Sequence, residues 1–315
     1  MQRTIVEECQ STTQIAESVK KFFMGASNNK ELNYKGNKGL DILLFLAMSG
    51  AWALNYSFLK FALVYEPPMV ALLFRALFGA IFSIPFSYST LRLVKSIGIG
   101  KLFIMSLLNV SLFMSLWFIG EQTESSSISS ILVYTYPIIS VFLSWLLLEE
   151  KLSTLKIIGI IVGFGGVVVI FLDELAISFS IGLFLLIGSA VSWSAGTIYF
   201  KKYLKNADMG AVNTYQFVFA VPVVLVATFF YGGFKPLTLN FILLTLYMGA
   251  IGSSAAYFIY WSLIKKYNVS HVSPYLFSVP ALSILFSALL NNNRLSALSL
   301  AGFALIAVGI FISSR

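Results

Sequence analysis

Charge, cysteine and histidine are all scarce in this sequence of 315 residues. Only 11% of the residues are charged, whereas a soluble domain carries about 25%. The single Cys and the single His exclude a disulfide framework and predict no metal site, and we expect no cofactor. No Asp or Glu lies in the middle of a long apolar run, so the sequence predicts neither a membrane enzyme with paired carboxylates nor strict proton coupling through a buried acid.

Apolar residues take the place of the missing charge. They make up 58% of the chain, and the mean hydropathy of +0.87 is typical of a membrane protein. The net charge of +8 would suit a nucleic-acid partner, but in a membrane protein it indicates basic cytoplasmic loops, so no nucleic acid is expected. Residues 1–39 form a polar tail, which we predict to be cytoplasmic and either a membrane-surface helix or disordered.

Ten apolar runs have about the length of a membrane-spanning helix. A span needs roughly 20 mostly apolar residues, and the loops between the runs are short, so consecutive helices should be antiparallel. We therefore predict an all-α membrane protein with ten transmembrane helices. The predicted spans are residues 41–60, 68–88, 100–120, 127–148, 154–172, 179–200, 210–231, 239–263, 271–290 and 297–313.

Lys and Arg are distributed unevenly between the two sides of these spans. With the N-terminus placed in the cytoplasm, 17 of the 21 basic residues fall on the cytoplasmic side. Three (Lys60, Lys235 and Arg294) fall outside, and Arg75 lies within a span. Positive charge marks the cytoplasmic side of a membrane protein. The prediction is a multi-pass protein of the cell membrane with both termini in the cytoplasm.

The second part of the chain repeats the first about 140 residues on, and an offset of 143 aligns Pro137 with Pro280. Over residues 127–166, 12 of 40 positions are identical to the positions aligned with them. We predict two homologous halves, residues 40–173 and 174–315, with five spans each. Because five is odd, the second half would enter the membrane upside down. Inverted repeats of this kind enclose a transport site near the midplane of the bilayer.

Short motifs recur in the same order in both halves. The first half contains Gly50-Ala51-Trp52, Leu73-Phe74-Arg75 and Leu148–Ser153, and the second contains Ser192-Trp193-Ser194 and Arg294-Leu295-Ser296. Over about residues 41–313, this doubled order resembles the EamA-type transporters of the drug/metabolite transporter superfamily. The resemblance implies two inverted five-helix EamA repeats, a central cavity for small organic solutes, and often export of amino acids, other metabolites or toxic compounds.

The second half departs from this pattern at two positions. Gln216 stands where the first half has Arg75, and Asn293 stands where it has Glu150. A role that relatives give to such a residue in both halves is therefore expected only in the first half of this chain.

Arg75 is the most informative candidate for a substrate-binding residue. It lies well inside the second span, and no Asp or Glu occurs between residues 67 and 120 to pair with it. A charge at that depth is costly and is usually functional. One interpretation is that Arg75 lines the cavity and attracts a carboxylate or phosphate. The alternative is that it reaches the outer interface or binds carbonyls of a broken helix.

Other candidates are aromatic and amide side chains within the spans. Pro137 and Pro280 predict bends at matching places in the fourth and ninth spans, although they could be static kinks. We expect Tyr260 and Trp261 in the interfacial belt, because they lie near the cytoplasmic end of their span. The remaining candidates for the cavity, which could instead be packing residues, are Trp52, Asn55, Tyr56, Asn109, Tyr134, Tyr136, Trp193, Tyr215, Gln216, Tyr257 and Tyr275.

The sequence thus predicts a carrier of small organic metabolites, with amino acids first and export as the expected direction. A carrier of nucleobases, nucleosides or other anionic metabolites is the alternative, and a membrane receptor or scaffold is the alternative of another class. The expected partners are a small-molecule substrate and the lipid bilayer. Glycines in the fifth and tenth spans would serve either packing within a monomer or a homodimer face.

Overall fold

The computed structural model describes residues 38–87, 91–172, 180–290 and 295–315, and every regular element in these ranges is a helix. The predicted tail therefore lies almost wholly outside the described residues, as do Asn293 and Arg294. The helices are α2 (Lys38–Tyr65), α3 (Pro68–Ser87), η1 (Leu91–Leu93), α4 (Val94–Ile97), α5 (Ile99–Ser106), η2 (Leu107–Leu112), α6 (Phe113–Thr123), α7 (Ser126–Val133), α8 (Tyr136–Leu148), α9 (Thr154–Ile170), α10 (Ile181–Tyr199), η4 (Phe200–Leu204), α11 (Met209–Phe230), α12 (Leu239–Gly249), η5 (Ala250–Ala255), α13 (Ala256–Lys266), α14 (Val269–Val272), η6 (Ser273–Phe277), α15 (Ser278–Leu290) and α16 (Ala297–Ser313).

An apolar helix lies at each of the ten predicted spans. Within the described ranges, eight helical stretches are long and apolar enough to cross a membrane, so the all-helical, multi-pass architecture is confirmed. The helices at the fifth and tenth positions, α9 and α16, contain only 17 residues each. Their length leaves the number of spans between eight and ten.

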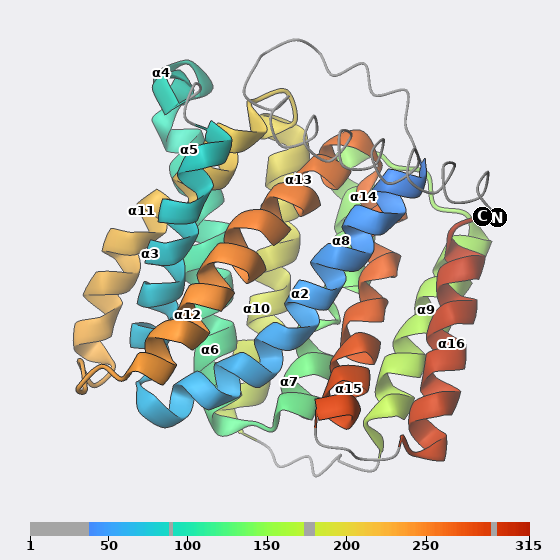
Figure 1. Cartoon of the computed structure of the whole chain (residues 1–315). Helices are drawn as coiled ribbons and strands as arrows, with labels where there is room; N and C mark the ends of the chain where they lie inside the picture. The colour runs from blue at the N-terminus through green and yellow to red at the C-terminus, as the bar shows by residue number, and fades with distance from the viewer. Residues whose placement is uncertain (1–37, 88–90, 173–179, 291–294) are drawn as a thin grey trace, which may run out of the picture.

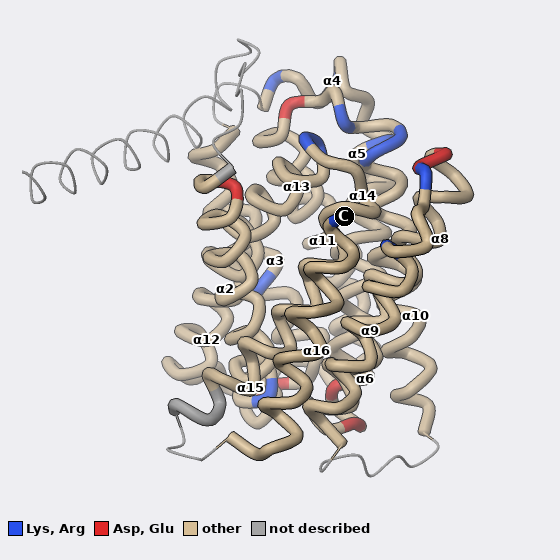
Figure 2. The backbone as a smooth tube through the Cα atoms, turned by 90° about the vertical axis from the view of Figure 1, so that its right-hand side faces the viewer, with Lys and Arg blue, Asp and Glu red and all other residues tan. Residues whose placement is uncertain are grey.

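The two halves of the chain run in opposite directions. In Figure 1, α2 begins at the end of the molecule where the C-terminus lies, whereas α10, the first helix of the second half, begins at the opposite end. Figure 2 shows that Lys and Arg gather at the end where α4 and the C-terminus lie, which we call the basic end. The helices thus form two oppositely oriented bundles that share one core.

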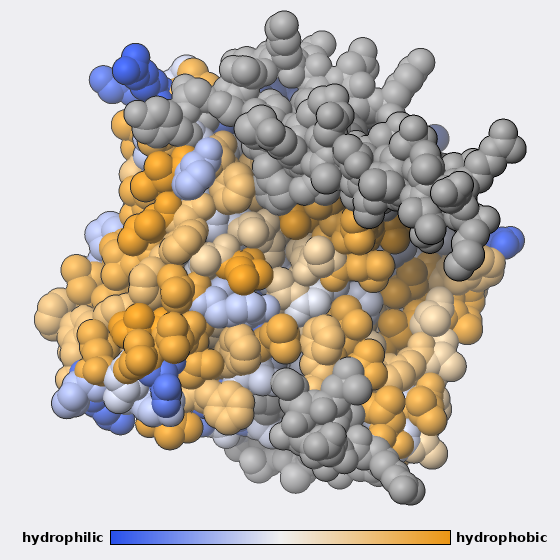
Figure 3. Space-filling model, viewed as in Figure 1, coloured by the Kyte–Doolittle hydropathy of each residue, from blue (hydrophilic) through white to orange (hydrophobic). Residues whose placement is uncertain are grey.

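Between its ends the molecule presents an apolar surface. Large side chains on the outer helix faces are exposed, including Phe230 (82%) and Val64 (74%). Figure 3 shows this apolar surface extending over α3, α11 and α12 on the visible face. Apolar side chains favour lipid over water, and helices can cross the lipid because they satisfy their own backbone hydrogen bonds.

Helices α9 and α16 pack closely side by side, as Figure 1 shows. A Cβ on Gly159 of α9 would lie 2.6 Å from the carbonyl oxygen of Gly309 on α16, and one on Gly166 would lie 2.8 Å from the carbonyl oxygen of Gly302. Ordinary van der Waals contacts begin at 3.4 Å. Only glycine lets the two backbones approach this closely.

Two lysines make equivalent contacts in the two halves. Lys60 Nζ, at the end of the first span, donates to the carbonyls of Glu121 (2.7 Å) and Glu124 (2.8 Å) at the end of α6. Lys201 Nζ donates to the carbonyls of Ile264 (2.7 Å) and Tyr267 (2.7 Å) at the end of α13. The repeat aligns Ile264 with Glu121 and Tyr267 with Glu124. A cation at a helix C-terminus stabilises the unpaired carbonyls there.

Candidate functional site

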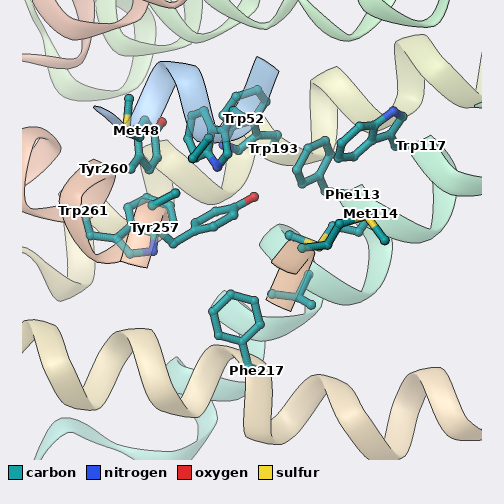
Figure 4. Packing of buried hydrophobic residues seen from close by; sticks show 14 of the residues in the cluster. Met48, Trp52, Phe113, Met114, Trp117, Trp193, Phe217, Tyr257, Tyr260 and Trp261 are labelled. Atoms are coloured by element: carbon teal, nitrogen blue, oxygen red, sulfur yellow. The ribbon is translucent and has the colours of Figure 1, made fainter. Parts of the chain in front are cut away.

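A small buried cavity of about 20 Å³ lies between the two halves of the chain. Figure 4 shows its aromatic surroundings, with Trp52 beside Trp193 and the ring of Tyr257 extending toward the space between them and Phe113. Each lining side chain is less than a tenth exposed, so the cavity is closed at both ends of the molecule. The lining residues are Trp52, Asn55, Tyr56, Arg75, Phe113, Trp117, Val133, Tyr134, Trp193 and Tyr257.

Arg75 contributes the one charged side chain of the cavity lining. Its Nε donates a hydrogen bond to Ser253 Oγ at 2.8 Å, and its guanidinium carbon lies 5.4 Å from the ring centroid of Trp117 and 5.6 Å from that of Phe118. No carboxylate among the described residues forms an ion pair with it, and Nη1 has no hydrogen-bond partner. A buried guanidinium with an unused donor favours an anionic group in the adjoining cavity.

Trp52 and Asn55 are oriented by the same carbonyl of the second half. Trp52 Nε1 donates to Gly252 O at 3.0 Å, and Asn55 Nδ2 lies 3.5 Å from it. Asn55 Oδ1 is buried and has no partner within the described part of the chain. The cavity therefore holds an unused acceptor as well as the unused donor of Arg75, a combination that suits a zwitterionic solute.

The aromatic rings form the walls of the cavity. The rings of Trp52 and Trp193 meet edge to face with centroids 5.5 Å apart, and Phe113 stacks on Trp193 at 5.0 Å. Tyr56 packs against Trp117 with centroids 5.0 Å apart. Such walls offer apolar and aromatic contacts to a bound group, and Trp193 Nε1 remains without a partner among the described residues.

Hydroxyl groups close the cavity on the side of the basic end. Tyr136 stacks on Trp193 with ring centroids 3.9 Å apart, and its hydroxyl is hydrogen-bonded to the hydroxyls of Tyr260 and Thr197. Thr197 Oγ1 also lies 2.9 Å from the Tyr260 hydroxyl. The expectation that Tyr260 and Trp261 lie in the interfacial belt is wrong, because both are fully buried in the core. Their helix passes between its neighbours at this depth rather than facing lipid.

On the opposite side the closure is mainly aromatic. Trp117 Nε1 donates to the carboxylate of Glu121 at 3.0 Å, and that carboxylate also accepts from the hydroxyl of Ser129. Glu121 is fully buried. Sequence reasoning missed Phe113, Trp117 and Val133 as lining residues. The repeat aligns Trp117 with Tyr260, so the two closures of the cavity contain equivalent aromatic residues.

Several predicted site residues lie outside this cavity. Asn109 is buried against Gly196, and Gln216 donates to Asn213 Oδ1 at 2.9 Å. Tyr215 reaches the carbonyl of Leu91 at the basic end. Tyr275 lines a separate groove of about 500 Å³ between α2, α13, α15 and α16. The central cavity thus takes its polar groups from fewer helices than the sequence suggested.

The helical geometry changes near both predicted bends. The fourth predicted span divides into α7 and α8 at Tyr134 and Thr135, and Pro137 lies in the first turn of α8. The ninth passes through the 3₁₀ segment η6 before α15, in which Pro280 lies in the first turn. Proline is tolerated in a first helical turn because it lacks the N–H that would be unpaired there.

Comparison with known proteins decides the family. The profile of the EamA-like transporter family matches residues 39–172 and, a second time, residues 180–315. The chain belongs to the EamA-like transporter family. It is thus a multi-pass membrane transport protein built from two EamA repeats.

Two other similarities agree with this family. The "Uncharacterized transporter YvbV" of Bacillus subtilis (strain 168) is 30% identical over 273 residues, which cover 85% of this chain and 89% of that protein. A protein of known crystal structure superposes with a TM-score of 0.72 at 17% identity, covering 87% of this chain and 96% of that one. At that identity the crystal structure supports the fold alone.

Proposed function

We propose that this EamA-like transporter exports small organic metabolites, amino acids first among them, by alternating access to the buried cavity. The observation that carries the proposal is the pair of unused polar groups inside an aromatic enclosure. Arg75 Nη1 is a buried donor without a partner among the described residues, and Asn55 Oδ1 is an acceptor in the same condition. A solute with a carboxylate, an amine and an apolar body would satisfy both groups once the helices move apart to admit it.

Ten spans with both termini in the cytoplasm form part of the proposal. The start of α2 and the C-terminus lie at the same end of the molecule, and this is the basic end. The positive-inside rule assigns that end to the cytoplasm of a cell membrane. Helices α9 and α16 then complete five spans in each repeat.

Closure on both sides supports alternating access. The Tyr136–Tyr260–Thr197 hydroxyl cluster separates the cavity from the cytoplasmic side, and Tyr56 with Trp117 separates it from the outside. Because the repeats run in opposite directions, an exchange of conformations between them would open one barrier and close the other. In this proposal, the closed cavity belongs to the state between the two openings.

The test is solute flux through purified protein in liposomes. Wild type should show saturable, competable flux of an amino acid with an apolar side chain, and Arg75→Gln should abolish it while unfolding at a similar temperature. Arg92→Gln is the matched control, because Arg92 is exposed at the basic end. Flux that is unchanged in Arg75→Gln would remove Arg75 from the site. Flux restricted to nucleobases or nucleosides would favour that substrate class, and no flux of any metabolite would favour a receptor or scaffold.

A further inference from the structure

The described residues contain three π-helical segments, and two of them, η2 and η5, interrupt long helices at equivalent places. The segment η2 lies between α5 and α6, and η5 lies between α12 and α13, and the repeat aligns Leu107 at the start of η2 with Ala250 at the start of η5. A π-helical turn is wider than an α-helical turn and shifts the backbone hydrogen bonds by one residue, and such turns are frequent at functional sites. The duplication therefore extends to this local distortion.

At η2 and at η5, helices of opposite repeats cross through an Asn–Gly pair. Asn55 on α2 lies against Gly252 in η5, where an added Cβ would fall 2.7 Å from its Cγ. Gly196 on α10 lies against Asn109 in η2, where an added Cβ would fall 2.5 Å from its Cγ. The two crossings are equivalent, with asparagine and glycine exchanged between the helices. Each crossing fixes the position of a π-helical segment relative to the other repeat.

Of η2 and η5, only η5 has a hydroxyl, that of Ser253, bonded to a cationic side chain, that of Arg75. Ser253 is fully buried, and its Oγ accepts the 2.8 Å hydrogen bond from Arg75 Nε. In the first repeat, the residue aligned with Ser253 is Val110. The counterpart of Arg75 is Gln216, whose Nε2 donates to Asn213 instead. The cation and the hydroxyl thus occur together once and are both replaced in the other repeat.

We infer that Ser253 is a positioning residue, which holds the guanidinium of Arg75 in the orientation needed to bind an anionic group. This role rests on the proposed function of the cavity. Nε is the guanidinium donor that Ser253 engages, which leaves Nη1 available to the ligand. The neighbouring Gly252 carbonyl orients Trp52. The segment η5 of the second repeat therefore organises a binding site whose charged group belongs to the first.

The first experiment observes Arg75 without any ligand. In protein labelled with ¹⁵N-arginine, the Nε–H signal that disappears in Arg75→Gln is assigned to Arg75. We expect this signal to be shifted or lost to solvent exchange in Ser253→Ala and retained in Ser253→Thr, which keeps the hydroxyl. Ser254→Ala is the matched control, because Ser254 is equally buried in η5 but bonds to Ser83. An unchanged Arg75 signal in Ser253→Ala would overturn the inference.

The second experiment measures affinity with L-leucine and L-leucinamide as probes, by titration of tryptophan fluorescence. A hydrogen bond to a charged group contributes enough that Ser253→Ala should bind L-leucine about tenfold more weakly. Affinity for the amide, which lacks a carboxylate, should not change, and Ser253→Thr should restore the affinity for L-leucine. Equal affinity of wild type and Ser253→Ala for L-leucine would overturn the inference. If wild type binds neither probe, the amino-acid proposal loses support, and the Arg75 signal alone decides the role of Ser253.

Discussion

The glycine contact between α9 and α16 gives a quantitative prediction for Gly159→Ala. The new Cβ would lie 2.6 Å from Gly309 O, which is 0.8 Å (3.4 − 2.6) closer than an ordinary contact allows, and it would also meet the backbone of Ser313. All these atoms belong to the backbone of α16, so the helices must move apart. Overpacking of this kind costs about 1–3 kcal/mol, and it leaves the other close contacts along the pair less well packed.

The matched control for this prediction is Gly165→Ala on the same helix, where a Cβ would meet nothing within 4 Å. Alanine favours a helix over glycine by about 1 kcal/mol at both positions, so the difference between the two variants isolates the helix contact. In thermal unfolding of the detergent-purified protein, Gly159→Ala should unfold about 5 °C below Gly165→Ala. Equal unfolding temperatures would refute the close packing of α9 against α16.

Two further substitutions test contacts at the basic end and between that end and the cavity. Glu150→Gln should lower the free energy of unfolding by about 1.5–3 kcal/mol, because the carboxylate accepts two backbone N–H groups at the start of α14, each at 2.9 Å. The exposed Glu149→Gln should have no measurable effect in the same chemical denaturation experiment. Tyr260→Phe removes the hydroxyl shared by Tyr136 and Thr197 and should cost about 1 kcal/mol; a denaturation curve that matches wild type would contradict this cluster.

The positions of the helices could be predicted from sequence because the bilayer sets a length scale. Charged or turn-forming residues separate the apolar runs, so even the boundary between the seventh span and the eighth falls near Gly232 and Gly233, which adopt positive φ. The sequence did not show whether α9 and α16, with 17 residues each, are long enough to cross the membrane. Hydropathy measures how apolar a helix is and not whether its length suffices, and α9 is as apolar as its longer neighbours.

The central cavity could be anticipated only in part. Arg75 was recognisable because an unpaired charge inside a span is costly, and Trp52 and Trp193 were recognisable as a repeated pair. Tyr215 and Tyr275 have the same polar-tipped aromatic chemistry but point elsewhere, because the rotation of each helix about its axis depends on packing that one sequence does not reveal. The π-helical segments have no compositional signature, so the role that we propose for Ser253 could not be predicted from the sequence.

The short length of α9 and α16 also affects the surrounding lipid. A helix of 17 residues is about 25 Å long at 1.5 Å per residue, about 5 Å less than the hydrocarbon thickness of a typical bilayer. As a pair of membrane spans, they would make the adjacent leaflets compress or draw headgroups inward along one edge of the protein. The acyl-chain length of the lipids would then change the packing of α9 against α16, the last helices of the two repeats. Membrane thickness would in this way affect the carrier.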